Sequence, residues 1–145
     1  MALFSAVRAG DAPAVAAWLD EGGSVDACCA EHPSTTLLMA AAMGGQEAVV
    51  RMLLQRGASV NLQTSDGSTA LMATANNGYT TTVQALLDAK ADASLQDEDG
   101  YTALMWAEHE KHIATAQLLR QHAERRAAEA EARAAVAATH VEAAA

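Results

Sequence analysis

The stretch Asp66-Gly67-Ser68-Thr69-Ala70-Leu71-Met72 returns 33 residues later as Asp99-Gly100-Tyr101-Thr102-Ala103-Leu104-Met105. The same register places Ser34-Thr35-Thr36-Leu37-Leu38-Met39 one period earlier. A fixed period of this size predicts a solenoid, because a unit this short cannot bury its apolar face without stacking on its neighbours. Chains of this kind usually act by presenting a surface.

Each unit is expected to contain two helices. Thr69 is suited to cap the first one, because its hydroxyl can accept from an unpaired backbone N–H. Gly78 stands where a left-handed residue ends that helix. The second helix carries Val83, Leu86 and Leu87, the i, i+3, i+4 spacing of a half-buried helix.

The pattern resembles the ankyrin repeat. The family's Thr-Pro-Leu-His-x-Ala core matches Thr69-Ala70-Leu71-Met72-Ala73-Thr74 and Thr102-Ala103-Leu104-Met105-Trp106-Ala107. Its Gly-Ala-Asp-Val-Asn loop matches Gly57-Ala58-Ser59-Val60-Asn61. The resemblance covers about residues 3–122 and implies an all-α solenoid of stacked helix-turn-helix units joined by β-turn loops.

Four repeats are predicted, at about residues 3–30, 31–63, 64–96 and 97–122. The first lacks its turn, and two extra residues are expected in the connection 27–35. In the fourth, Lys111 replaces the helix-ending glycine. Because lysine rarely adopts a left-handed conformation, this reversal is expected to be built differently.

Residues 123–145 are predicted to form a helical tail or linker. They include 12 alanines, separated mainly by Glu and Arg, all good helix formers. Three arrangements stay open: a solvated extension of the last repeat helix, a lid over the exposed end of the fourth repeat, and a helix that self-associates through its alanines.

The charge balance indicates the kind of partner. The formal net charge is −9, and residues 1–122 hold 14 acidic and 6 basic side chains. Such a balance disfavours binding to nucleic acid or to an anionic membrane surface. We therefore expect a protein partner with a basic or neutral segment.

Two adjacent cysteines, Cys28 and Cys29, do not indicate a disulfide framework. The N-terminus lacks the pattern of a secretory signal, and no run reaches the roughly 20 apolar residues of a membrane helix. A cytoplasmic or nuclear location is expected, with a monomer as the default state.

No residues form a persuasive catalytic or metal-binding pattern. The cluster Glu108-His109-Glu110-Lys111-His112 lacks the four-residue histidine spacing of a helical zinc site, and its two histidines should diverge where the helix ends. Cys28-Cys29-x-x-His32 lacks paired zinc-ligand spacing. No enzyme activity and no cofactor are expected.

The resemblance implies a partner-binding surface formed by the turn tips and the exposed side of each first helix. In the first repeat it includes Arg8 and Ala9. The remaining positions are His32, Pro33, Thr35, Met43 and Gly44 in the second repeat, Ser65, Asp66, Ser68, Asn76 and Asn77 in the third, and Glu98, Asp99, Tyr101, His109 and Glu110 in the fourth.

Acids outnumber cations on this surface: Asp66, Glu98, Asp99 and Glu110 against Arg8. Four stacked units give a groove of roughly 30–40 Å, enough for an extended peptide or a helix burying roughly 800 Å² per side. Tyr101 is the leading anchor, with packing over its own turn as the alternative. Met43 is either an apolar contact or a sideways packing residue.

The primary hypothesis is a non-catalytic interaction module that grips a basic or polar protein segment along this groove. The alternative is a structural or assembly protein that self-associates through the Ala-rich C-terminal helix.

Overall fold

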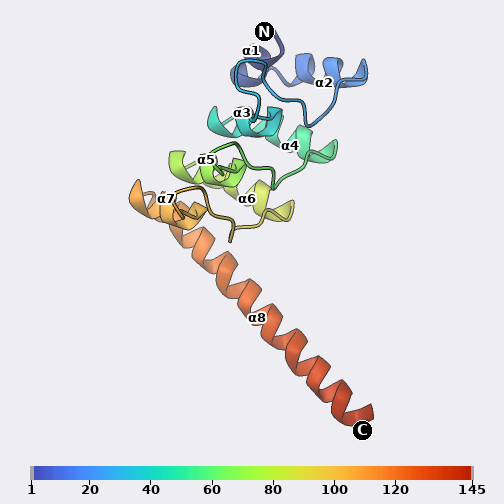
Figure 1. The fold of residues 1–145 in the computed structure, drawn as a ribbon, viewed down its shortest axis with the longest axis vertical. Coiled ribbons are helices and arrows are strands. Elements are labelled where there is room, and N and C mark those ends of the chain that lie inside the picture. Colours follow the sequence, from blue (N-terminus) through green and yellow to red (C-terminus); the bar gives the residue numbers. More distant parts are fainter. Residues whose placement is uncertain (1, 145) are drawn as a thin grey trace.

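The computed structural model describes residues 2–144, and the side chains of residues 3–139. Within these residues all the regular secondary structure elements are helices, with one isolated antiparallel bridge between Cys28 and Thr36. The helices form four consecutive pairs (Figure 1): α1 (Ala2–Ala9) and α2 (Ala12–Asp20), α3 (Leu37–Met43) and α4 (Glu47–Gln55), α5 (Ala70–Asn77) and α6 (Thr80–Asp88), and α7 (Ala103–His109) and α8 (Ile113–Ala144).

Threonine starts each of the inner helices α3, α5 and α7. The hydroxyls of Thr36, Thr69 and Thr102 accept hydrogen bonds from backbone N–H groups three residues later, at 3.2–3.3 Å. Each bond satisfies one of the donors that a helix start leaves unpaired. The predicted cap at Thr69 is confirmed, and it recurs in the second and fourth repeats.

A left-handed residue follows the first helix in every repeat. Gly78 has φ 72°, as predicted, and its counterpart Lys111 has φ 61°. The expectation of a different reversal at Lys111 is wrong. His112 N–H donates to Ala107 O at 2.8 Å, as Tyr79 N–H does to Thr74 O at 3.0 Å. These bonds hold lysine in a conformation that costs about 1–3 kcal/mol.

The core lies between two layers of helices. The first helices stack on one another in the order α1, α3, α5, α7, and the second helices form a parallel row beside them. Val50 and Leu53 of α4, and Val83 and Leu86 of α6, are completely buried. The predicted apolar stripe therefore faces the core and joins neighbouring repeats.

The outer face of the fourth repeat carries charges where the third repeat carries apolar groups. Ala75 and Leu87 are buried in the third repeat, and the second repeat has the same two residue types at these positions. The fourth repeat has Glu108 and Arg120 instead, joined by a 2.8 Å ion pair. Charged outer faces keep a terminal repeat hydrated, so this pair suits the uncovered face of the last repeat.

Helix α8 continues well beyond the fourth repeat, as expected. It runs for 32 residues and projects from the solenoid as a single rod (Figure 1). The interpretation of the tail as a lid over the fourth repeat is therefore wrong for residues 123–144, and residue 145 lies outside the described residues. No helix in the described part of the chain combines the length and apolarity needed to cross a membrane.

Candidate interaction surface

The turns that precede the first helices form a row of projecting tips. Thr64 N–H donates to Ser68 O at 2.8 Å, and Asp97 N–H donates to Tyr101 O at 3.0 Å. In the second repeat the matching bond runs from Cys29 N–H to Thr35 O at 2.9 Å. This turn is two residues longer, which places the predicted insertion at the tip.

Neighbouring tips are hydrogen-bonded to one another. Ser65 N–H donates to the Ser34 hydroxyl at 3.0 Å, and Glu98 N–H donates to Asp66 O at 2.9 Å. One of these bonds ends on a side-chain hydroxyl and the other on a backbone carbonyl, and both help to fix the spacing of the tips. The tips therefore form one continuous edge beside the first helices.

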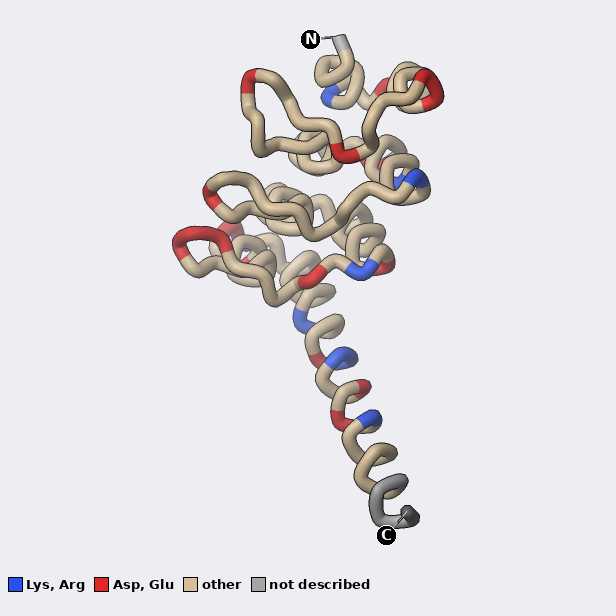
Figure 2. Tube along the Cα trace, turned by 45° about the vertical axis from the view of Figure 1, so that its right-hand side comes forward, with Lys and Arg blue, Asp and Glu red and all other residues tan. Residues whose placement is uncertain are grey.

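Acidic residues gather on this edge (Figure 2). Asp66, Glu98 and Asp99 are exposed there, as is Glu31, which sequence reasoning missed. The Asp66 carboxylate is bound within its own turn by the Thr64 hydroxyl and by Ser68 N–H at 3.4 Å. The Thr64 bond is the main reason that the pKa of Asp66 lies below its usual value.

A pocket of about 450 Å³ opens between the first and second repeats. Its lining residues are Arg8, His32, Thr35, Ala40, Met43 and Gly44. All but Ala40 were predicted surface residues, and they come from helix α1, the second turn and helix α3. Met43 is 59% exposed. The alternative prediction, that Met43 packs sideways on a neighbouring helix, is therefore wrong.

Three rings cluster at the opposite end of the surface. The ring centroids of Tyr101 and Trp106 are 4.9 Å apart, and His109 lies 6.3 Å from Tyr101 and 6.0 Å from Trp106. Tyr101 thus packs against rings of helix α7 while staying partly exposed. Sequence reasoning missed Trp106, although it stands three residues before His109, on the same side of α7.

Asp97 holds this cluster in place. One carboxylate oxygen accepts from the N–H groups of Tyr101 at 2.9 Å and Asp99 at 3.0 Å, and the other accepts from Trp106 Nε1 at 2.9 Å. The carboxylate therefore fixes the turn and the indole together, and it adds a negative charge beside the rings.

The family model Ankyrin repeats (3 copies) matches residues 38–128. The chain is an ankyrin repeat protein. Ankyrin repeats are generally protein–protein interaction modules and are typically non-catalytic. No curated protein matches the chain.

The remaining predicted positions of this ankyrin repeat protein lie at the ends of helices α5 and α7. Asn77 Nδ2 donates to Ala73 O at 3.0 Å. Asn76 O is 3.0 Å from His112 Nε2, and His109 Nδ1 is 3.0 Å from Glu110 Oε1. His109 and His112 thus have separate partners, as the predicted helix end requires. Among the described residues, no group of three His, Cys, Asp or Glu side chains is placed to hold a metal ion.

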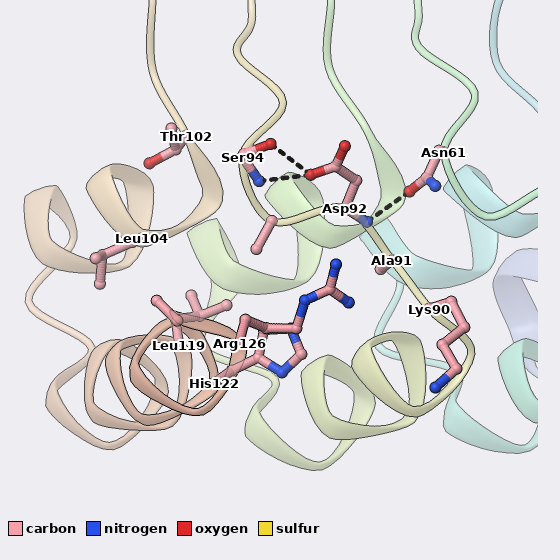
Figure 3. Close-up of a pocket in the computed structure, with 12 residues that line it drawn as sticks. Asn61, Lys90, Ala91, Asp92, Ser94, Thr102, Leu104, Leu119, His122 and Arg126 are labelled. Atoms are coloured by element: carbon pink, nitrogen blue, oxygen red, sulfur yellow. Dashed lines mark hydrogen bonds between the residues drawn. The ribbon is translucent and has the colours of Figure 1, made fainter. Parts of the chain in front are cut away.

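A second pocket, of about 560 Å³, lies between helix α8 and the loop 90–94 (Figure 3). Arg126 projects from α8 toward Asp92, and His122 lies beside it. The Asp92 carboxylate accepts from Ser94 N at 2.9 Å and Ser94 Oγ at 2.5 Å. Burial, followed by the charges of Arg126 and Arg125, lowers the pKa of His122. Sequence reasoning missed this pocket, because it forms where Ala123 and Arg126 of α8, beyond the last repeat, lie beside repeat residues of the loop 90–94.

Proposed function

We propose that this ankyrin repeat protein is a non-catalytic interaction module whose groove grips a basic or polar segment of a partner protein. The groove is the surface formed by the turn tips and the exposed sides of helices α1, α3, α5 and α7. The observation that carries the proposal is the row of exposed acids along the tips (Figure 2).

Glu98 and Asp99 are the best acids to test. Both are exposed, and in the described part of the chain neither carboxylate accepts a hydrogen bond that holds the turn together. Charges at the rim of an interface act mainly on association rate and salt dependence. Replacing them should therefore change binding without unfolding the repeat.

The test is affinity capture from a lysate at low and at physiological salt. The baits are the wild-type chain, the Glu98→Lys, Asp99→Lys variant, and a control, Glu21→Lys, Glu131→Lys, with the same change in net charge away from the groove. We expect proteins captured by the wild type and the control to be lost from the Glu98/Asp99 variant. Identical captures by all three baits would contradict the groove assignment.

A second candidate is an assembly role through the projecting part of α8. Val136 is 68% exposed there, beside Ala132 and Ala137. Sedimentation over a wide concentration range would test it. Mass that rises with concentration, and no longer rises in an Ala132→Lys, Val136→Lys variant, would support self-association; a monomer at all concentrations would exclude it.

A further inference from the structure

The second and fourth repeats differ most at three equivalent positions on the groove. Two periods of 33 residues separate these repeats, so Thr35, Ala40 and Met43 of the second repeat correspond to Tyr101, Trp106 and His109 of the fourth. The third repeat has Ser68, Ala73 and Asn76 there. The same scaffold therefore leaves a pocket at one end of the groove and fills the equivalent space with rings at the other.

The ring cluster of Tyr101, Trp106 and His109 suits a cationic side chain. An ammonium or guanidinium group is attracted to the face of an aromatic ring, most strongly to that of tryptophan. The adjacent carboxylates of Asp97, Asp99 and Glu110 add Coulombic attraction. At the tip of this repeat, Glu98 and Asp99 are exposed. A neutral or acidic side chain would gain neither contribution.

The Met43 pocket suits a different group. Met43 and Ala40 supply apolar surface, while Arg8 stands at the pocket as the one cation of the predicted surface. A positively charged side chain would be repelled by Arg8, whereas an aliphatic or aromatic one would bury apolar area against Met43. The two ends of the groove therefore select opposite side-chain types.

Their separation sets a spacing. Packed helices lie 8–10 Å apart, so two steps from α3 to α7 span about 16–20 Å. An extended chain advances about 3.3 Å per residue, which places the two side chains about five or six residues apart.

We propose that the groove recognises an extended peptide with an Arg or Lys against the ring cluster and an apolar side chain about five or six residues away in the Met43 pocket. This inference rests on the proposed groove function and adds the specificity of the partner segment. It assigns recognition of the cation to the fourth repeat alone.

The test is selection from a phage-displayed library of random 12-residue peptides. One matched variant, Tyr101→Ser, Trp106→Ala, His109→Asn, carries the residues that the third repeat has at the same positions, so the scaffold accommodates them. A second variant, Thr35→Tyr, fills the Met43 pocket with the residue found in the fourth repeat. Circular dichroism checks that both variants are folded.

We expect the wild type to enrich peptides with the proposed pair at the proposed spacing. The ring variant should lose the preference for Arg or Lys, and affinity for a selected synthetic peptide should fall roughly 2- to 30-fold, the range for a cation on an aromatic face. Thr35→Tyr should remove the apolar preference and leave the cationic one.

The results that would overturn the inference also show whether the groove function fails with it. If the wild type selects nothing, both the inference and the groove function fail. If selected peptides lack the pair, or keep their affinity in the ring variant while losing it in Glu98→Lys, Asp99→Lys, the groove function stands and the two-point specificity is wrong. If the ring variant unfolds, the single variant Trp106→Ala replaces it in the affinity measurement. Unchanged affinity of the selected peptide for Trp106→Ala would also show that the two-point specificity is wrong.

Discussion

The second and fourth repeats have the same local backbone structure, but the second has a neighbouring repeat on each side and the fourth has one on one side alone. Met39 and Met105 occupy equivalent positions, and both accept a hydrogen bond through sulfur from the capping threonine N–H at 3.4 Å. Met39 is 3% exposed and Met105 is 47% exposed. The difference teaches that burial in a solenoid depends on having a neighbour on each side, not on the residue type or its local bonds.

The sharpest way to break this comparison is truncation of the matched methionines. Met39→Ala should lower the free energy of unfolding by about 2–5 kcal/mol, as for other buried large-to-small changes. Met105→Ala should cost about 1 kcal/mol or less, because half of that side chain is already in water. Urea denaturation followed by circular dichroism measures both, and equal costs would refute the argument.

A smaller effect is expected from the turn residues Asp97 and Thr64, which occupy equivalent positions. Asp97→Ala removes three hydrogen bonds to a carboxylate and should cost about 1–3 kcal/mol. It should also shift the Trp106 fluorescence to longer wavelength by freeing the indole. Thr64→Ala should cost about 1 kcal/mol, since it removes weaker bonds, and its emission spectrum should match that of the wild type.

The outer face of the fourth repeat gives a third test. The double change Glu108→Ala, Arg120→Leu gives the fourth repeat the residue types that the third repeat has at the equivalent positions, Ala75 and Leu87. Stability of the monomer should change by about 1 kcal/mol or less, because exposed ion pairs contribute little. The newly apolar face should instead cause concentration-dependent association in sedimentation experiments. A variant whose mass rises with concentration no more than that of the wild type would show that the ion pair does not keep this face from associating.

The smallest effect concerns acid sensitivity in the third repeat. The pKa of Asp66 is lowered in the folded chain, chiefly by the Thr64 hydroxyl. Its stabilising effect is therefore complete above the unfolded pKa of about 3.9 and is lost as pH falls through the lower folded pKa. The stability gap between the wild type and Asp66→Asn should shrink between pH 5 and 3 in urea titrations. A gap that does not change with pH would argue that the turn bonds do not depend on the charge.

Sequence reasoning succeeded for most features that are local or periodic. Thr69 caps α5 and Gly78 ends it, because both depend on backbone groups within four residues. Arg8, His32, Thr35 and Met43 could be assigned to one surface because the repeat register specifies which side of each unit is exposed. The prediction of a different chain reversal at Lys111 failed. There the hydrogen bonds of the reversal outweigh the preference of a left-handed position for glycine.

The sequence by itself determined the period, the helix starts and ends and the buried stripe, since these follow from short-range bonds and hydrophobic spacing. Only the tertiary structure decided which side chains meet across repeats: the pocket beside Met43, the ring cluster held by Asp97, the ion pair of Glu108 and Arg120, and the projection of α8. The physical reason is that contacts between side chains far apart in sequence depend on rotamers and on the neighbours present, which periodicity does not specify.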